Sequence, residues 1–250
     1  VLVVCMAFPW GTSRAQTEIP GLPSEQDMNE TRLKMLANAA IDTGLERDAI
    51  PSLDGPSFIS VADASLTFDR NDVVFVTELG GAVYIIPQPI LVWHEILNML
   101  VGEDIHSITY CPLTGSVIGY KGQIGLHNTA FGTSGKLVNS NLLMYDRATN
   151  SLWPQILGMA IQGPLRGKSA EIFPVRWSSF GLAKRAWPKA KVLSSATGFK
   201  RQYSRDPYGS YHRKGSYYFN RQLVYPVNPR DTRLPPKERV ICLKQGTAGM

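Results

Sequence analysis

The sequence predicts a mainly β protein of the α+β class, in which antiparallel strands form a barrel-like or sandwich-like sheet with two or three peripheral helices. Two observations lead to this class. Aromatic residues make up 10% of the 250 residues, and many fall in short runs between Gly, Pro and Asn, a spacing that favours many short strands over long helices. With 44% hydrophobic and 18% charged residues, the chain is also apolar enough to fold around a full core.

The first 47 residues divide into a leader and a polar segment. Residues 1–10 form an apolar run as long as the hydrophobic region of a signal peptide, and Ser13-Arg14-Ala15 provides small residues at a cleavage site. Neither Met nor a basic segment precedes the run, so residues 1–15 are expected to be a signal peptide clipped at its N-terminus. The mature protein is therefore expected in the periplasm or outside the cell. Residues 16–47 are interpreted as a polar lead and a helix, the helix over residues 31–45.

Residues 48–250 are interpreted as the main domain, and most of its expected elements are strands. Residues 73–86 predict two strands joined by a turn at Gly80 and Gly81. Pro87 and Pro89 predict the start of a helix that runs to about residue 100, because proline is tolerated in the first turn of a helix. Further strands are expected over residues 105–111, 116–120, 137–145 and 151–157, and a short helix over residues 177–187.

The two ends of this domain differ in charge. Residues 1–165 carry 8 Lys and Arg against 16 Asp and Glu, whereas residues 166–250 carry 18 against 4. The basic C-terminal third would complement the acidic part within one fold, or contact an anionic surface or an acidic partner. No nucleic-acid-binding motif is present, so nucleic acid is not expected as a partner. Beyond the leader, no segment approaches the ~20 apolar residues of a membrane span.

A weak internal repeat bears on the end of the domain. Residues 238–250 can be laid over residues 72–84, with three identities and the same strand–turn–strand shape. The second copy stops in mid-strand, so the domain is expected to be truncated at its C-terminus.

Cys111 is the central candidate for chemistry, because it ends an expected strand just before a turn. A thiol at such a place would serve as a metal ligand, a redox group or a nucleophile. It would equally be a small buried side chain or one half of a disulfide with Cys242. The sequence leaves these alternatives open.

The expected helix over residues 87–100 places His94 on its inward face, with Glu95 beside it. His94, with its imidazole oriented by Glu95 or another carboxylate, would activate Cys111 as a nucleophile. With His127 or Met144 added, the same pair would suit copper or another soft metal ion, the one cofactor that this donor set favours. The alternative for His94 is a core histidine whose hydrogen bonds are satisfied by the protein.

Six polar residues are candidates for ligand binding: Asn139, Asn141, Asp146, Arg147, Asp206 and Tyr208. Asn139 and Asn141 would share one face of an expected strand, where asparagine is disfavoured unless it hydrogen-bonds a turn or a ligand. Asp206 and Tyr208 would line a polar pocket, although turn chemistry explains the Asp-Pro pair equally well.

Several long segments together resemble one family. They are Asp48-Ala-Ile-Pro-Ser-Leu-Asp-Gly-Pro56, Leu91-Val-Trp-His-Glu-Ile-Leu-Asn98, Thr109-Tyr-Cys-Pro-Leu-Thr-Gly115, Phe131-Gly-Thr-Ser-Gly-Lys-Leu-Val-Asn-Ser-Asn-Leu-Leu-Met-Tyr-Asp-Arg147, Ser151-Leu-Trp-Pro-Gln155 and Asp206-Pro-Tyr-Gly-Ser-Tyr211. In these segments, from about residue 48 to the C-terminus, the chain is similar to the domain of unknown function 3179 family of bacterial and archaeal proteins.

The resemblance implies no activity, because the family has none assigned. It implies that Cys111, the run Trp93-His94-Glu95 and the motif Asp206-Pro-Tyr208 are places where members look alike. Many relatives have a second cysteine where this chain has Thr114, so a two-cysteine site would be incomplete here.

Three functions therefore stay open. The first is an exported, non-catalytic binding or structural module with a site near Cys111 and His94. The alternatives are a metal-binding or redox protein that uses the same two residues, and an enzyme with Cys111 as its nucleophile. No Cys-x-x-Cys, His-Glu-x-x-His or phosphate-loop pattern is present to decide among them.

Overall fold

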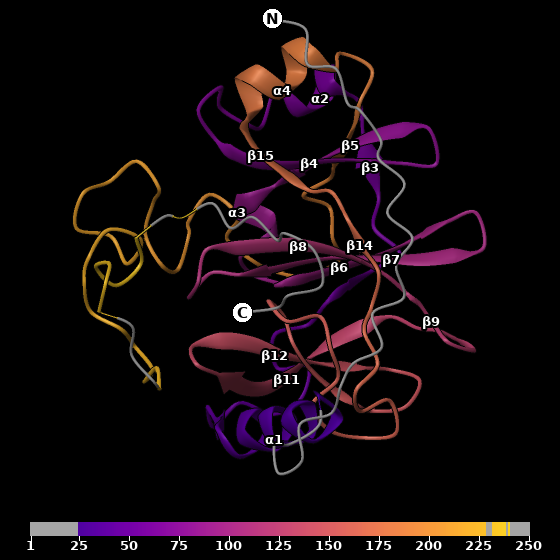
Figure 1. Ribbon diagram of the computed structural model, residues 1–250. Coiled ribbons are helices and arrows are strands. Elements are labelled where there is room, and N and C mark those ends of the chain that lie inside the picture. The colour runs from indigo at the N-terminus through magenta and orange to yellow at the C-terminus, as the bar shows by residue number, and fades with distance from the viewer. Residues whose placement is uncertain (1–24, 229–231, 239, 241–250) are drawn as a thin grey trace, which may run out of the picture.

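A computed structural model describes residues 25–228, 232–238 and 240 (Figure 1). The protein is mainly β, as the sequence predicts. Three sheets are stacked in layers, with helices on the two outer faces. The sandwich-like arrangement is confirmed, and no sheet of the described residues closes into a barrel. The described part has four helices rather than two or three: α1 (Glu25–Asn38), α2 (Val61–Ala64), α3 (Gln88–Leu91) and α4 (Phe180–Ala186).

The outermost sheet, beneath α2 and α4, has the strand order β15-β4-β5-β16-β3. The strands are β15 (Arg176–Ser179), β4 (Val73–Leu79), β5 (Ala82–Pro87), β16 (Lys191–Leu193) and β3 (Phe58–Ile59). The middle sheet has the order β14-β8-β7-β6-β2. Its strands are β14 (Ile172–Phe173), β8 (Ser116–Lys121), β7 (Asp104–Cys111), β6 (Ile96–Val101) and β2 (Leu53–Asp54).

The third sheet packs on α1 and has the order β1-β11-β12-β13. Its strands are β1 (Ala40–Asp42), β11 (Phe131–Val138), β12 (Asn141–Asp146) and β13 (Leu152–Pro154). A small hairpin of β9 (Gln123–Ile124) and β10 (His127–Asn128) projects from the side. Neighbouring strands are antiparallel except in the pairs β16–β5 and β2–β6.

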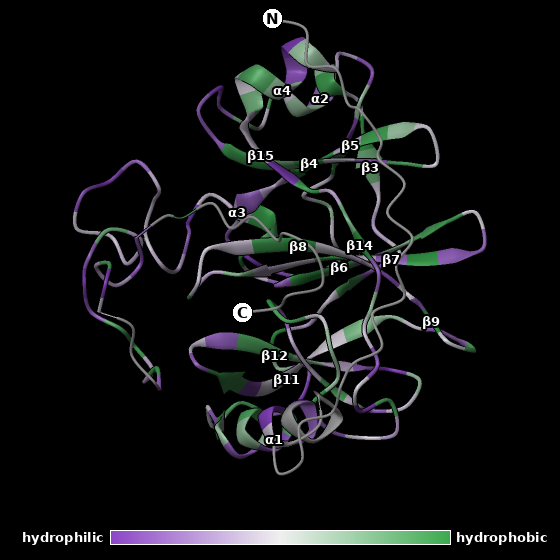
Figure 2. Cartoon of the chain, in the orientation of Figure 1, coloured by the Kyte–Doolittle hydropathy of each residue, from purple (hydrophilic) through white to green (hydrophobic). Residues whose placement is uncertain are grey.

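Hydrophobic side chains fill the spaces between the layers (Figure 2). Part of one cluster, which includes Phe75, Ile86 and Tyr110, lies between the outer and middle sheets. A second cluster, which includes Cys111 and Met144, lies between the middle sheet and the third sheet. Strand β7 serves both clusters because successive side chains of a strand point to opposite faces.

Turn chemistry explains the hairpins. Gly80 and Gly81, with φ of 56° and 73°, join β4 to β5 as the sequence predicts. Asn139 and Ser140, with φ of 50° and 61°, join β11 to β12. Two successive left-handed residues are the pattern of a two-residue hairpin turn.

Four element predictions are corrected. The helix expected over residues 87–100 is only the short α3, because residues 96–101 pair with β7 as strand β6. The strand expected over residues 137–145 is interrupted by the turn at Asn139 and Ser140. The helix expected over residues 31–45 runs instead from Glu25 to Asn38, and that over residues 177–187 begins at Phe180, where Ser179 caps its first turn.

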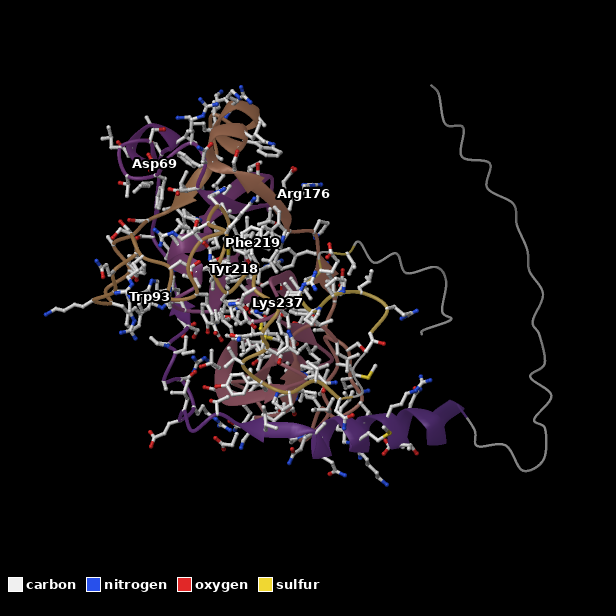
Figure 3. All side chains as sticks on the ribbon, turned by 90° about the vertical axis from the view of Figure 1, so that its left-hand side faces the viewer. Asp69, Trp93, Arg176, Tyr218, Phe219 and Lys237 are labelled. Atoms are coloured by element: carbon white, nitrogen blue, oxygen red, sulfur yellow. The ribbon has the colours of Figure 1, made fainter. Side chains whose placement is uncertain are left out.

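The polar tail after β16 covers one side of the stacked sheets, with Tyr218 near the middle of the covered face (Figure 3). In the described part of the chain, no helix is long and apolar enough to span a bilayer. The expected signal peptide (residues 1–15), Cys242 and residues 241–250 of the suggested repeat lie outside the described residues.

Candidate functional site

Glu95 occupies an unusual position in the turn between α3 and β6. Its amide donates a hydrogen bond to the carbonyl of Leu91 (2.7 Å), and its own carbonyl accepts one from the amide of Tyr110 (2.7 Å). These two bonds hold it in the left-handed region, with φ of 58°. A non-glycine residue there stores of the order of 1–3 kcal/mol of strain, and such residues cluster at functional sites.

The Glu95 side chain is 7% exposed and lines a cavity of about 70 Å³. No other described residue hydrogen-bonds its carboxyl group. Burial raises the pKa of Glu95 to about 8, because removal from water disfavours the charged form. At neutral pH the group is therefore mostly a neutral carboxylic acid, which still has no protein partner.

Two further titratable groups lie close to this carboxyl group. Burial first, and then the neighbouring Glu95, raises the pKa of the Cys111 thiol. Burial, followed by the charges of Glu95 and Cys111, likewise raises the pKa of Tyr208, whose side chain lines the same cavity. We call the space that Glu95 and Tyr208 line the inner cavity; Cys111 lies close to Glu95 but does not line it.

Cys111 itself is a free thiol, 1% exposed, at the end of β7. Its sulfur donates a weak hydrogen bond to the carbonyl of Ser140 (3.8 Å), and the Thr114 hydroxyl also hydrogen-bonds it. Because the thiolate is the nucleophilic form, a buried thiol with a raised pKa is poorly suited to attack a substrate. The contact also places position 114, where many relatives have cysteine, directly beside Cys111.

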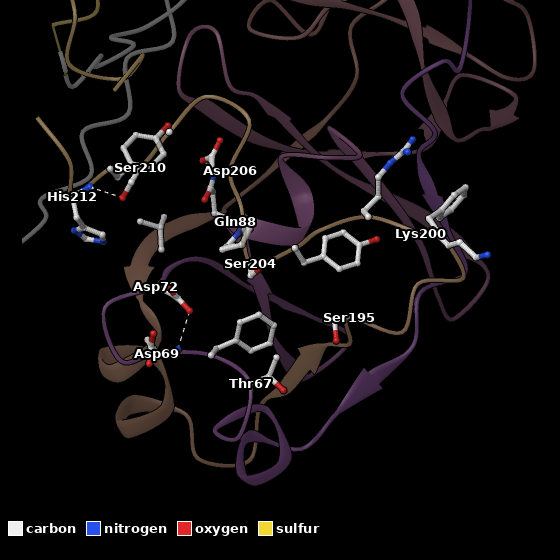
Figure 4. A pocket seen from close by; sticks show the side chains of 18 residues that line it. Thr67, Asp69, Asp72, Gln88, Ser195, Lys200, Ser204, Asp206, Ser210 and His212 are labelled. Carbon is white, nitrogen blue, oxygen red and sulfur yellow. Dashed lines mark hydrogen bonds between the residues drawn. The ribbon is translucent and has the colours of Figure 1, made fainter. Parts of the chain in front are cut away.

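A larger polar hollow of about 550 Å³, the outer cleft, lies between the tail and the edge of the outer sheet (Figure 4). Asp69 and Asp72 lie at one side of it, and Lys200 lies at the other. Burial raises the pKa of Asp72. The aromatic rings of Phe199 and Tyr203 complete the wall on the tail side.

Asp206 anchors the tail beside this cleft. Its Oδ1 accepts a hydrogen bond from the amide of Tyr208 (2.8 Å). Its Oδ2 accepts one from Gln88 Nε2 (2.9 Å) and one from the Tyr218 hydroxyl (2.8 Å). Both carboxylate oxygens are thus used to fold the tail onto α3, which sets the shape of the cleft.

A comparison with protein-family models identifies the group to which these features belong. The model described as "Protein of unknown function (DUF3179)" matches residues 47–249, most of the chain. The chain belongs to the DUF3179 family. Comparison with curated proteins gave no match, and comparison with solved structures gave none either.

In this DUF3179 protein the motif Asp206-Pro-Tyr208 stands between the two hollows. Asp206 borders the outer cleft, whereas Tyr208 borders the inner cavity. The run Trp93-His94-Glu95 likewise contributes to both regions, because His94 holds the tail and Glu95 lines the inner cavity. Segments that are far apart in the sequence therefore meet at one edge of the middle sheet.

His94 is fully buried, and the protein satisfies both of its ring nitrogens. Nδ1 lies 2.8 Å from the carbonyl of Pro51, and Nε2 lies 2.7 Å from the hydroxyl of Tyr203. Burial lowers the pKa of His94, so the ring is neutral and donates to the carbonyl while it accepts from the tyrosine. None of its described contacts is with Cys111, and the core-histidine alternative describes it best.

The donors proposed for a soft metal are not gathered in one place. His127 is exposed on β10 in the projecting hairpin, whereas Met144 is buried in the second hydrophobic cluster with Cys111. Among the described residues, no three His, Cys, Asp or Glu side chains form a group that would hold a metal ion.

The four candidates near β12 are bonded to the protein. Asn139 lies in the turn, where its side chain accepts from the amide of Asn228 (3.0 Å), so it does not share a strand face with Asn141. Asp146, fully buried, accepts hydrogen bonds from the amide of Ser151 and from Trp153 Nε1, both at 3.0 Å. Arg147 forms an ion pair with Asp48 (3.3 Å).

The hydrogen bonding of the Asn141 side chain is explained by Gln155, a buried residue that the sequence analysis did not single out. Gln155 is fully buried and accepts from Asn141 Nδ2 (2.9 Å) and from the Ser116 hydroxyl (2.6 Å). Its own amide donates to the Thr109 hydroxyl (3.1 Å). This network ties the middle sheet to the third sheet behind Cys111, and the polar Gln in the motif Ser151-Leu-Trp-Pro-Gln155 was its only sequence signal.

Proposed function

We propose that this DUF3179 protein is a non-catalytic binding protein that takes a small zwitterionic solute into the outer cleft. The observation that carries the proposal is the separation of charge across that cleft, with Asp69 and Asp72 on one side and Lys200 on the other (Figure 4). A solute with an ammonium group and a carboxylate or phosphate group would meet opposite charges at both ends.

The size and chemistry of the cleft support the same proposal. A volume of about 550 Å³ lies within the range of roughly 300–1,000 Å³ typical of small-molecule sites. The rings of Phe199 and Tyr203 add apolar surface to the lining of the cleft. Within the described residues, no serine or threonine hydroxyl of the cleft is paired with a histidine ring as an activated nucleophile requires. The His212 ring bonds the carbonyl of Asn71 (2.8 Å), and the His94 ring bonds the phenolic hydroxyl of Tyr203 (2.7 Å).

The test is binding of glycyl-leucine, a zwitterionic dipeptide, compared with its N-acetylated amide, which lacks both charges. We expect the dipeptide to raise the free energy of unfolding by about 2.7 kcal/mol at a hundredfold excess over Kd, and the amide to have no effect. Asp72→Asn and Lys200→Gln should each weaken binding by about tenfold, the effect of losing about 1.4 kcal/mol. Lys189→Gln, at an exposed cation outside the cleft, is the control. Equal effects of the dipeptide and its amide would contradict the proposal.

We also propose that the protein acts outside the cytoplasm. The support is the apolar run of residues 1–10 followed by Ser13-Arg14-Ala15. Expression of the full chain behind a Met codon, with mass spectrometry of the periplasmic fraction, should give a mature chain that begins at Gln16. Retention of the uncleaved chain in the cytoplasm would contradict this.

The basic C-terminal third gives a further expectation. Among the described residues, the ion pairs that join it to the acidic part are Lys121–Glu171 (2.6 Å) and Arg166–Glu30 (2.7 Å). The cations of α4, Lys184 and Arg185, instead border an open hollow together with Arg70. Contact of this end with an anionic surface or partner remains a prediction, measurable as salt-sensitive retention on a sulfated matrix.

A further inference from the structure

The inner cavity is a separate place from the outer cleft, and its walls have a different chemistry. Three leucine side chains give it an apolar lining: Leu113, in the turn between β7 and β8, and Leu137 and Leu142 of the third sheet. The rings of Tyr208 and Tyr225 close it from the tail side. Its volume of about 70 Å³ is several times the minimum that one water molecule needs, so a group of a few heavy atoms fits.

The polar feature of this apolar space is the Glu95 carboxyl group. The residue is more than nine-tenths buried, and no other described residue hydrogen-bonds its carboxyl group, whose oxygens keep a small accessible surface where the residue lines the cavity. Buried ionisable groups are normally paired, because an uncompensated charge in an apolar environment costs several kcal/mol. An unpaired carboxyl group at a strained backbone position is therefore a feature that packing alone does not explain.

The protein supplies no cation for this group among its described residues. Lys136 is the cation in the cavity wall, but its Nζ is paired with Asp42 at 2.8 Å. The other titratable groups that border or face the carboxyl group are Cys111, Tyr208, Tyr225 and Glu46, and none of these carries a positive charge. A partner for Glu95 would therefore come from outside the chain.

We propose that the inner cavity binds a primary ammonium group on a short alkyl chain, with the Glu95 carboxylate as its counter-ion. The tyrosine rings would add cation–π attraction, and the leucines would surround the alkyl carbons. A metal ion is a poorer occupant because the described residues provide no group of three donor side chains.

Binding would be linked to proton release. At pH 7 the unliganded Glu95, with its pKa of about 8, holds a proton that must leave before the carboxylate can pair with an ammonium ion. Each ligand bound at pH 7 therefore displaces about one proton, and the affinity rises with pH up to about 8. A ligand that accepts a hydrogen bond from the neutral acid would show the opposite dependence.

The experiment is isothermal titration of the full mature chain with propylammonium chloride at millimolar concentrations, in phosphate and in Tris at pH 7. The two buffers differ in ionisation enthalpy, so the difference in heat gives the number of protons released. Propionamide, a neutral compound of similar size, is titrated in parallel. We expect propylammonium to bind with release of about one proton, and propionamide to bind at least tenfold more weakly.

Variants assign the binding to Glu95. Glu95→Gln should abolish propylammonium binding, whereas Glu103→Gln, at an exposed residue outside the cavity, and Asp72→Asn, in the outer cleft, should retain it. Retained binding in Glu95→Gln would overturn the proposal, as would tighter binding of propionamide than of the amine. No binding of propylammonium to the wild-type chain would also overturn it and leave a water-filled cavity. The result is independent of the dipeptide experiment, because different residues are tested.

Discussion

Glu95→Gln gives the sharpest test of the inner cavity, because it removes the charge while it keeps the size of the side chain. The Glu95 pKa is about 8 in the folded protein against 4.5 for the unperturbed group. Between these pH values the folded state holds a proton that the unfolded chain has lost. The free energy of unfolding therefore falls as pH rises from about 4.5 to about 8, and it is level above that range.

The magnitude follows from the size of the shift. Each pH unit within the window is worth about 1.4 kcal/mol, so the wild-type protein should lose about 4 kcal/mol between pH 5 and pH 8.5 through this group. Glu95→Gln lacks the titration and should not lose this contribution. Relative to the wild type, the variant should therefore gain about 4 kcal/mol over the same range.

The assay is urea unfolding of both proteins, followed by tryptophan fluorescence, at pH 5, 6, 7, 8 and 8.5. Taking the difference between the two proteins cancels the titration of groups that they share. Glu46→Gln, at an exposed residue of the same cavity, is the matched control and should show a difference that is nearly independent of pH. A wild-type minus Glu95→Gln difference that stays within about 1 kcal/mol across the range would refute the reasoning.

Three further predictions concern the framework around the cavity. Asp146→Asn should destabilise the protein by about 2–4 kcal/mol in urea unfolding, because it removes charge-assisted bonds and leaves buried donors facing an amide group; an unchanged midpoint would contradict this. Gly135→Ala should lower the free energy of unfolding by more than about 1–3 kcal/mol, because φ is 75° and an added Cβ would overlap the carbonyl oxygen of Leu45. Gly81→Ala, where the added Cβ meets open space, should lower it by less. Cys111 is buried with a raised pKa, so it should not react with a water-soluble thiol reagent at pH 7.5 in the native state. The native wild type and Cys111→Ser should therefore consume equal amounts of reagent. In denaturant, the wild type should consume one equivalent of reagent more than the variant.

The strands that the sequence predicted correctly are those with two agreeing signals. Residues 73–86 combine β-branched and aromatic residues with a Gly-Gly turn, and they form the hairpin β4–β5. The strands on either side of the turn at residues 112–115 were likewise defined by alternation and by turn residues, and they pair as β7 and β8. Where local propensity and turn chemistry agree, the fold follows from short segments.

The errors arose where one signal was ambiguous. The apolar run after Pro89 suits a helix or a buried strand equally well by periodicity, and pairing with β7, a tertiary contact, decides for strand β6. Asn139 was interpreted as a strand residue, although asparagine followed by a small residue is also a signal for a left-handed turn. That signal would have placed Asn139 in the hairpin turn and Asn141 at the start of the next strand.

The sequence identified some residues of the candidate site, but their roles depend on contacts that only the folded structure shows. The sequence singled out Cys111, Glu95 and Tyr208, and the fold brings them close together, with Glu95 and Tyr208 lining one cavity. It could not assign their roles, because the role of Glu95 depends on burial and on the absence of a described partner, which are properties of the folded environment. Asp69, Asp72 and Lys200 of the outer cleft were missed, since single charged residues in polar loops have no distinguishing pattern.

The backbone at Glu95 strengthens the argument that its carboxyl group has a role beyond packing. A left-handed residue that ends a short helical turn is most simply glycine, which adopts φ near 58° without strain. Glycine here would also remove a buried, unpaired acid, so by both measures it would make a more stable protein. The chain instead keeps a residue that is unfavourable in backbone and in side chain, directly beside Cys111 and Tyr208. Residues that contradict the local preferences of the backbone and of burial are most often found at functional sites. Glu95 is such a residue, and it lines the inner cavity.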